Sequence, residues 1–366
     1  MSKTHKDNVT EIDEIMQRKK DGIDIPLSRN VQSRTTSNFL EYVKLIHNAL
    51  PEIDFEEINL ETNFLNHKFD LPLIIDSMTG GTTEASKING RLGKIAEKYH
   101  LGMGLGSQRA GLKSSSLAET YSIARNNAPT AFIFANIGGA QISKGLTLQE
   151  IQKIIDMIKA DAVAIHLNPL QELIQPEGEP RYRGVLDRIT EISEKVSIPV
   201  IVKEVGAGIS KEVALKLKNS RISAINVSGV GGTSWAAVER MRAEEQQDNL
   251  KTHLGDLFWD WGLPTAQSLI ETKSVVQDSI PIIASGGLRT GLEVCKCLVL
   301  GANVCAMAYP FLKSASESIE SLERFMERIS MEIKSTMFLT GCQNINQLSK
   351  LRYILTGELE ERVINR

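Results

Sequence analysis

The stretch DAVAIHLNPLQE, Asp161–Glu172, is an apolar strand that ends at Pro169 with polar side chains gathered at its carboxyl end. Residues two apart on a strand point to the same face, so His166 and Asn168 are expected to point together. An ordinary strand that leaves the core through a polar loop is the alternative. Other apolar strands along the chain end in the same way, which favours a shared functional edge.

Apolar runs of strand length alternate with helical patterns over most of the chain. The eight predicted strands are residues 73–78, 101–107, 131–137, 161–168, 199–204, 222–228, 280–287 and 302–308. This count and order predict an α/β fold of the (β/α)8 TIM barrel type, which usually takes about 250 residues. A doubly wound open sheet is the rival, but no G-x-G-x-x-G opens a helix after the first strand.

The flanking regions predict an N-terminal extension over residues 1–70, a barrel over 71–313 and C-terminal helices over 314–366. The polar start of the chain, with RKK at 18–20, has the character of a solvated or unstructured segment. Residues 38–50 then show helical spacing that ends at a proline. A hairpin follows before residue 70, and we expect it to plug one end of the barrel.

Charge and composition exclude several classes of protein. The formal net charge of −3 argues against a dedicated nucleic-acid binder. No apolar run is long enough for a membrane span, and the N-terminus lacks the apolar core of a signal peptide. The cysteines show no CxxC spacing, so we expect buried, reduced thiols and a cytoplasmic protein. They are Cys295, Cys297, Cys305 and Cys342.

Glycine and polar residues recur at the carboxyl ends of the predicted strands, where barrels place their chemistry. The strings at these ends include MTGG, SQR, ANIGG, KE, SGVGGTSW, SGGLR and MAYP. Glycine allows a flat ligand or a phosphate to approach the backbone, and barrels commonly bind phosphate after strands seven and eight. One GG pair often marks a plain turn, but several in register favour a ligand site.

The sequence leaves more than one role open for several side chains at these strand ends and for Glu239 on a following helix. Lys203, inside an apolar strand, could face an electron-accepting ring or form a structural ion pair. Glu172 could hold Mg²⁺ or be an exposed glutamate, and His166 could contact a substrate or be a core histidine. Arg109 offers a fork suited to phosphate. Glu239 could be a catalytic or orienting carboxylate, or a residue of a helix surface.

The chain resembles the type 2 isopentenyl-diphosphate isomerases, FMN-dependent enzymes with a (β/α)8 barrel. The matching strings are RKK near the N-terminus and then MTGG, GSQR, ANIGG, HLNPLQE, QPEGEP, VKE, SGVGGTSW, WGLPTA, SGGLRTG and MAYPFLK. They run in family order from Met78 to Lys313, and HLNPLQE together with QPEGEP is highly specific. One departure is Gly22, at the place where the family usually has a histidine.

The resemblance implies the residues of the site. The implied FMN contacts are Met78, Thr79, Gly80, Ser107, Asn136, Lys203, Ser228, Thr233, Gly287, Leu288, Arg289, Ala308 and Tyr309. The implied substrate contacts are Arg18, Lys19, Ser107, Gln108, Arg109, His166, Asn168 and Gln171. The candidate catalytic residues are Gln171, Lys203, His166 and Glu239. Glu172 would bind Mg²⁺ against the diphosphate.

The implied reaction moves a double bond between isopentenyl and dimethylallyl diphosphate at reduced FMN, without net redox change. An apolar pocket excludes water, and an electron-rich face stabilises positive charge as it develops. NADPH is the expected reductant, although the sequence shows no nicotinamide fingerprint. The expected partners are a small diphosphate and further copies of the chain, as a tetramer or octamer, with no nucleic acid and no membrane.

Two other functions remain open from the residues. An FMN-dependent dehydrogenase or oxidase on the same barrel would need a His-Arg pair at the strand ends for proton abstraction. A flavin-binding protein without catalysis would be expected to lack His166, Asn168 and Gln171, and all three are present.

Overall fold

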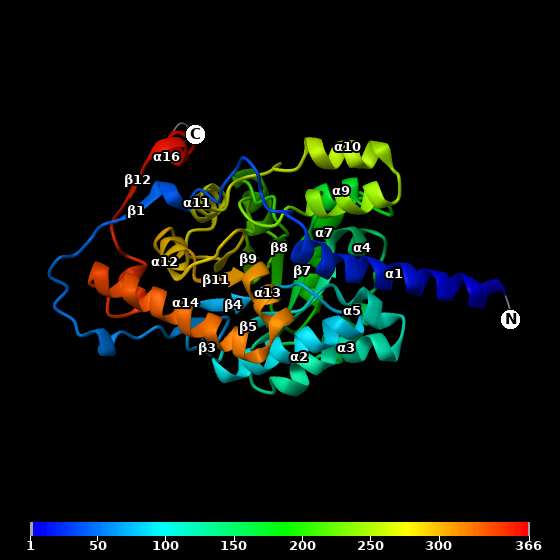
Figure 1. Cartoon of the computed structure of the whole chain (residues 1–366), viewed down its shortest axis with the longest axis horizontal. Coiled ribbons are helices and arrows are strands. Elements are labelled where there is room, and N and C mark those ends of the chain that lie inside the picture. The colour runs from blue at the N-terminus through cyan, green and yellow to red at the C-terminus, as the bar shows by residue number, and fades with distance from the viewer. Residues whose placement is uncertain (1–2, 365–366) are drawn as a thin grey trace.

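Eight parallel strands close into a barrel in the computed structural model, which describes the backbone of residues 3–364 and the side chains of residues 13–363 (Figure 1). The barrel strands are β4 (Leu73–Ile75), β5 (Gly102–Gly104), β6 (Ile133–Gly138), β7 (Ala162–Leu167), β8 (Val200–Glu204), β9 (Ala224–Asn226), β10 (Ile282–Ala284) and β11 (Val304–Met307). They pair in chain order, and β11 closes onto β4. The closed ring confirms the TIM barrel and excludes the open sheet.

Helices surround the barrel, and short strands lie outside it. The helices of the barrel region are α2 (Thr83–Lys98), α3 (Ser115–Asn127), α4 (Gly139–Ser143), α5 (Leu148–Met157), α6 (Pro169–Ile174), α7 (Val185–Lys195), α8 (Lys211–Lys218), α9 (Trp235–Glu245), α10 (Asn249–Leu257), α11 (Thr265–Val276), α12 (Gly291–Val299) and α13 (Tyr309–Glu317). The flanking helices are α1 (Lys3–Ser28), α14 (Ile319–Thr340), α15 (Ile345–Leu348) and α16 (Gly357–Ile364). The remaining elements are β1 (Val43–Leu45), β2 (Thr62–Phe64), β3 (His67–Phe69), β12 (Tyr353–Leu355) and the 3-10 turns Leu40–Tyr42, Phe55–Glu57 and Gln108–Leu112.

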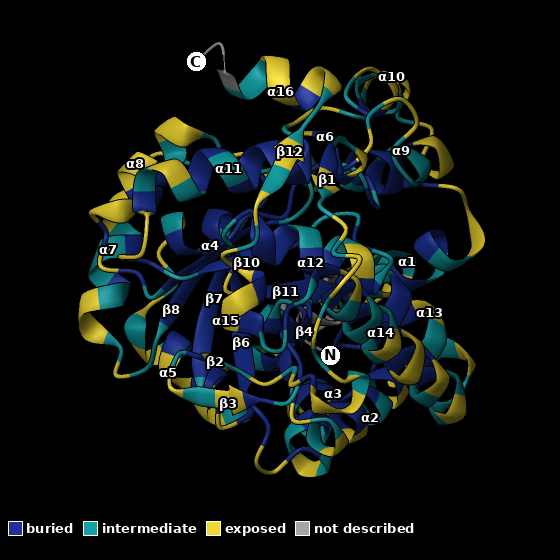
Figure 2. Ribbon diagram, turned by 90° about the vertical axis from the view of Figure 1, so that its left-hand side faces the viewer, coloured by how far each residue is buried: buried dark blue, intermediate teal, exposed yellow. Residues whose placement is uncertain are grey.

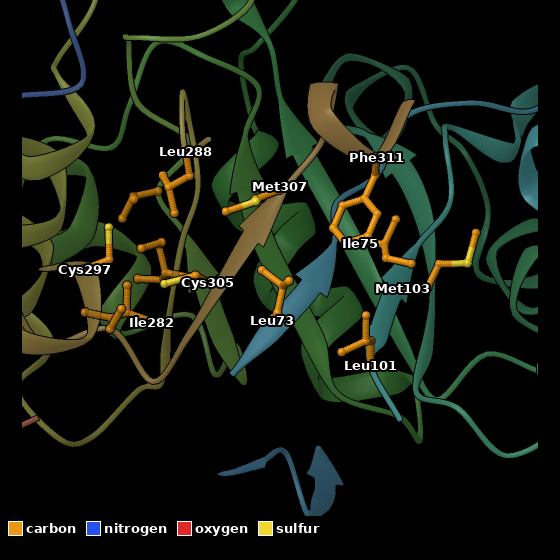
Figure 3. Close-up of a cluster of buried hydrophobic side chains, with 14 of the residues drawn as sticks. Leu73, Ile75, Leu101, Met103, Ile282, Leu288, Cys297, Cys305, Met307 and Phe311 are labelled. Atoms are coloured by element: carbon orange, nitrogen blue, oxygen red, sulfur yellow. The ribbon is translucent and has the colours of Figure 1, made fainter. Parts of the chain in front are cut away.

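Alternate residues of each strand belong to two different cores. Leu73, Ile75 and Met103 point outward into the large core between strands and helices, where the buried Cys297 and Cys305 also lie (Figure 3). The inward residues form a second cluster inside the barrel, namely Ile74, Phe134, Ala162, Ala164, Ile201, Ala224, Ile283, Val304 and Ala306. Figure 2 shows these buried strands ringed by helices whose outer faces are exposed. The inside of the barrel is therefore packed, with room for a site only at its mouth.

The hairpin of β2 and β3 closes the amino-terminal end of the barrel, as predicted. Its strands are antiparallel, and Leu65 and Asn66 at the turn both have positive φ, as a two-residue type I′ turn requires. Phe64 and Phe69 are buried in the interior cluster and contact the ring of Phe132. With this end filled, a ligand can enter only from the carboxyl ends of the strands.

The N-terminal segment is a helix as far as Ser28, so the prediction of a solvated or unstructured segment is wrong up to that residue. Helix α1 continues to Ser28 and packs beside α9, α13 and α2. Ile15 and Ile23 of this helix are buried. The apolar stripe was hidden because the same side of the helix also carries Arg18 and Lys19, which face a cavity instead of a core.

The predicted helix over residues 38–50 is also wrong. A single 3-10 turn follows Phe39, whose left-handed backbone (φ 62°) cannot continue a helix. Strand β1 comes next and pairs with β12 near the end of the chain. The partner lies some 300 residues away in sequence, so local spacing alone could not reveal it.

Two compositional expectations can be compared with the structure. All four cysteines are buried and free, as expected. In the described part of the chain, no helix combines the length and the apolar character that crossing a bilayer demands.

Gly22 should be replaceable with a gain in stability. It lies inside α1, where glycine costs about 1 kcal/mol relative to alanine. A Cβ at Gly22 would meet Trp235 as its nearest neighbour, at an ordinary 3.7 Å. We expect Gly22→Ala to stabilise α1 by about 0.5–1 kcal/mol, seen as slower amide hydrogen exchange along the helix.

Gly93→Ala in α2 is the matched control, and it should destabilise the protein. The new Cβ would stand 2.7 Å from the backbone oxygen of Ala124 in the neighbouring helix. If the two substitutions changed the stability equally, the close contact between position 93 and Ala124 would not determine the outcome, and this prediction would be wrong.

Candidate active site

The inward face of the barrel turns polar at the mouth. Two residues beyond the inward apolar side chains, the strands present Asp76, Asn136, His166, Lys203, Asn226 and Ser285. Because side chains alternate along a strand, the same period that packs the interior sets these groups on the cavity side. Asp76, Asn136, His166 and Lys203 line the main cavity directly.

The cavity lies between this polar ring and two helices. Helix α1 contributes Arg18, Lys19, Gly22 and Pro26, and α9 contributes Trp235, Val238, Glu239 and Arg242. Its empty space is about 1280 Å³, counted out to the open mouth. Predicted residues that line it are Arg18, Lys19, Met78, Ser107, Asn136, His166, Asn168, Gln171, Glu172, Lys203, Ser228, Thr233, Glu239, Ala308 and Tyr309.

His166 is a neutral donor–acceptor in this site. Its Nδ1 lies 2.6 Å from the amide oxygen of Asn136, which can only accept, so Nδ1 carries the proton and Nε2 is free to accept. Burial, together with the charges of Lys203, Lys19 and Arg18, lowers the pKa of His166 to about 3. The ring therefore does not gain a charge near neutral pH, and it can accept a hydrogen bond from a ligand.

Lys203 forms the structural ion pair that its sequence position left open, and its side chain also lines the cavity. Its Nζ lies 3.7 Å from the carboxylate of Asp76, and both side chains are almost fully buried. Nζ also donates to the backbone oxygen of Glu204 at 2.9 Å. Asp76 in turn accepts from the amide of Asn226, which accepts from the hydroxyl of Ser285 at 2.6 Å. Lys203 thus faces the cavity while a structural ion pair holds it in place.

Two cations, Arg18 and Lys19, lie on one side of the cavity, and Arg109 lies near them outside the lining. Lys19 donates from Nζ to the backbone oxygen of Ser107 at 3.0 Å. Burial lowers the pKa of Lys19 to about 7, and the charges of Arg18 and Arg109 add to the shift. Burial and the charge of Arg109 lower the pKa of Arg18 as well, although Glu177 opposes this. An anion would stabilise these half-buried cations, because neighbouring positive charges lower the pKa of each, so this side fits a phosphorylated ligand.

Gln171 of α6 and the buried Glu239 of α9 form a hydrogen-bonded pair in the cavity lining. The Gln171 amide donates to a carboxylate oxygen of Glu239 at 2.8 Å. Asn168 donates to the amide oxygen of Gln171 at 3.1 Å. Glu239 is 1% exposed, which excludes a helix-surface role. Burial raises the pKa of Glu239, and the nearby Arg242 opposes that shift.

Glu172 is a buried carboxylate at the edge of the cavity, not an exposed glutamate. One of its oxygens accepts from the backbone N–H of Glu179 at 3.0 Å, and the other lies 3.5 Å from the amide nitrogen of Asn168. The described residues contain no group of three or more metal-ligating side chains. A magnesium ion here would therefore use Glu172 with oxygens from a ligand and water, as magnesium often does.

Several predicted residues lie outside the lining. They are Thr79, Gly80, Gln108, Arg109, Gly287, Leu288 and Arg289. Gln108 is turned into the interior, where its amide donates to the backbone of Ile154 at 3.0 Å and accepts from the backbone of Asn136 at 3.1 Å. Its side chain braces strand β6, so the predicted substrate contact does not fit this geometry. The Leu288 side chain lies in the outer core, which leaves only its backbone for a ligand (Figure 3).

The residues around the cavity fit FMN. The buried hydroxyls of Ser77 and Thr79 have no hydrogen-bond partner among the described residues, and Ser228 in the lining has a strained positive φ of 36°. The guanidinium of Arg289 lies 5.2 Å from the ring of Tyr309 at the start of α13. Arg289 and Tyr309 also border a second hollow that Lys313, Arg324 and Arg328 line. A phosphate would find positive charge there, while the ring would lie toward Lys203.

Comparison with known proteins agrees with this geometry. Residues 139–354 match the family model of FMN-dependent dehydrogenases. The isopentenyl-diphosphate delta-isomerase of Archaeoglobus fulgidus is 45% identical over 346 residues, which cover 94% of this chain and 97% of that protein. The Nostoc sp. protein of the same name is 46% identical over 331 residues, or 90% and 93% of the two chains. The chain belongs to the isopentenyl-diphosphate delta-isomerase family. This confirms the resemblance stated from the motifs.

Solved structures outside this isomerase family share its fold. A lactate oxidase of Pediococcus acidilactici superimposes with a TM-score of 0.66 at 15% identity and covers 94% of each chain. Mandelate oxidase gives a TM-score of 0.59 at 14% identity, over 94% of this chain and 98% of that one. At such low identity these neighbours show the barrel alone.

Asp76, Arg242 and Gln141 are among the cavity residues that the sequence of this isomerase-family chain did not reveal. Asp76 stands two residues before Met78, so strand alternation could have found it. Arg242 lies one helical turn after Glu239 and shares its face. Gln141 lines the cavity with a buried amide oxygen that has no partner, and no local pattern marks it.

Proposed function

We propose that the protein interconverts isopentenyl and dimethylallyl diphosphate at reduced FMN. The observation that carries this proposal is a single cavity lined by the cations Arg18 and Lys19 of α1 and by the hydrogen-bonded pair of Gln171 and the buried Glu239. A charged head and an apolar reacting end of one substrate would be held at the cations and at this pair, respectively. The isopentenyl-diphosphate delta-isomerases that the chain resembles support the assignment.

The residues of the chain bind and orient, and bound FMN, when reduced, supplies an electron-rich face and proton-transferring atoms. Arg18 and Lys19 would bind the diphosphate. Trp235 and the buried Val238 would exclude water from the alkene. Glu239 can hold a proton because burial favours its protonated form, and its ionised form, which Arg242 favours, can stabilise positive charge. Gln171 would fix the direction of that carboxylate.

The metal ion, the flavin reductant, the oligomeric state, the compartment and the domain bounds are also proposals. Glu172 would hold Mg²⁺ against the diphosphate, and NADPH would reduce the flavin. We further propose a homo-oligomer of four or eight copies in the cytoplasm. Within each copy we propose an extension over residues 1–70, a barrel over 71–313 and C-terminal helices over 314–366.

The direct test uses the purified protein under anaerobic conditions. Isopentenyl diphosphate, FMN, Mg²⁺ and excess NADPH or dithionite should yield dimethylallyl diphosphate without stoichiometric loss of the reductant. Absence of product with fully reduced flavin would refute the proposal. The match to FMN-dependent dehydrogenases makes a dehydrogenase or oxidase the second candidate. That candidate requires one equivalent of a hydroxy acid or NAD(P)H to be consumed for each product.

Substrate binding should depend on the protonation of Lys19. Its pKa of about 7 means that the charged form is lost as the pH rises through neutrality. A bound diphosphate favours the charged form, so kcat/KM should fall with the slope of one proton above about pH 7. Lys19→Met should remove this limb and raise KM about 10- to 100-fold, the range of a charge-assisted hydrogen bond. An unchanged pH profile in the variant would show that another group causes the titration.

A further inference from the structure

Arg242 is a buried cation that holds three carboxylates from three different parts of the chain. Its Nη1 donates to Glu239 on the same helix at 2.7 Å. Its Nε donates to Asp21 of α1 at 3.0 Å. Its Nη2 donates to Glu177, in the loop after α6, at 2.8 Å. The Arg242 side chain is 5% exposed, so protein groups and not water surround it.

Each of the three carboxylates belongs to a different part of the active site. Asp21 follows Arg18 and Lys19 by less than one helical turn, so its position fixes where those cations stand. Glu239 accepts the hydrogen bond from Gln171 at 2.8 Å. One side chain therefore connects the helix that carries the cations with the Gln171–Glu239 pair.

Glu177 belongs to the specific string QPEGEP, which the proposed mechanism leaves without a role. Gly178 in this string fits only as glycine, because a Cβ there would come within 2.0 Å of the backbone oxygen of Glu172. The next residue, Glu179, donates its backbone N–H to the Glu172 carboxylate. The QPEGEP loop thus buttresses Glu172, and its link to Arg242 fixes it relative to α1 and the Gln171–Glu239 pair.

We propose that Arg242 is a positioning residue that docks α1 and the QPEGEP loop onto the Gln171–Glu239 pair. Anchoring of the substrate head and presentation of its reacting end are then set by one guanidinium. The planar fork of arginine can serve three carboxylates in fixed directions, which a lysine cannot do. This inference rests on the proposed roles of Arg18, Lys19 and Gln171.

Single substitutions can remove the carboxylate contacts of Arg242 separately or together. Asp21→Asn should release α1 only, with KM for isopentenyl diphosphate raised about tenfold and kcat changed less than about twofold. Arg242→Gln should raise KM to the same extent and also lower kcat at least about tenfold, because the Gln171–Glu239 pair loses its support. Arg242→Lys should not restore either constant. Asp21→Asn, Arg242→Gln and Arg242→Lys should all keep the flavin absorbance of the parent protein.

The double variant Asp21→Asn with Arg242→Gln separates this role from general destabilisation. If α1 docks through Arg242, its KM should be no higher than that of Arg242→Gln alone, because the second change removes nothing further. Arg240→Gln is the matched control, since Arg240 lies on the same helix but pairs with Glu244 and Asp256 outside the cavity. It should leave both constants unchanged.

Amide hydrogen exchange along α1 tests docking without any turnover. Exchange in α1 should accelerate in Asp21→Asn and in Arg242→Gln, but not in Arg240→Gln. Additive effects on KM, or α1 protected equally in all variants, would overturn the proposal. If Arg242→Gln does not fold, Asp21→Asn and Glu177→Gln still test single contacts. A parent protein without isomerase activity would refute the proposed function, whereas the exchange result would still decide the role of Arg242.

Discussion

Glu239→Gln is expected to lower kcat by about 10²–10⁴-fold while the protein keeps its flavin, the range that a positioned acid–base or charged group supplies. The substitution keeps the shape of the side chain but removes a buried negative charge next to Gln171. Positive charge that develops on the alkene would lose its counter-charge, and no proton could be held at this oxygen. Steady-state turnover of isopentenyl diphosphate with reduced FMN measures the effect.

Glu244→Gln on the same helix is the matched control. Glu244 is exposed and pairs with Arg240, so its charge is screened by water and lies outside the cavity. Its removal should leave kcat within about twofold. Glu239→Gln with turnover close to that of the parent would exclude the carboxylate from the chemistry and leave Gln171 as a purely structural partner.

Lys203→Met is expected to abolish retention of FMN and to reduce the free energy of unfolding by about 3–5 kcal/mol. The methionine fills the space of the lysine stem but leaves Asp76 as a buried carboxylate without its cation. An isolated buried charge costs far more than the ion pair contributes. Urea unfolding reports the stability, and the absorbance of the purified protein reports the flavin.

A second substitution distinguishes the two losses. Asp76→Asn added to Lys203→Met removes the unpaired charge, so most of the stability should return while the protein stays colourless. Recovery of flavin in the double variant would mean that Lys203 does not contact the ring. An unchanged urea midpoint in Lys203→Met would mean that water reaches the Asp76 carboxylate and that the pair is not buried.

Most of the barrel and the placement of its polar mouth could be predicted from the sequence. Strand alternation is a local property, so the period that buries Ala164 also directs His166 toward the cavity. The same rule applies to Ile201 and Lys203. The hairpin at residues 62–69 was equally visible, because two short runs around a tight turn form their own contacts.

Gln108 shows where a motif misleads about geometry. The string GSQR identifies the loop after β5, but the direction of each side chain depends on what the neighbouring elements offer. The backbone oxygen of Ile154 and the N–H of Asn136 both need partners, and Gln108 supplies them from between the two elements. No pattern within the loop indicates that Gln108 turns inward while Ser107 lines the cavity.

By itself the sequence determined the barrel, the hairpin at its amino-terminal end and the family, since these follow from local periodicity and from strings of adjacent residues. Only the tertiary structure decided that α1 forms one wall of the cavity, that β1 pairs with β12, and that Arg242 joins Asp21, Glu177 and Glu239. The physical reason is the separation of the partners along the chain. By its pattern alone, a helix face that carries Arg18 and Lys19 is a solvated face. Helix α9, more than 200 residues later in the chain, contacts α1 and makes this face the side of a cavity.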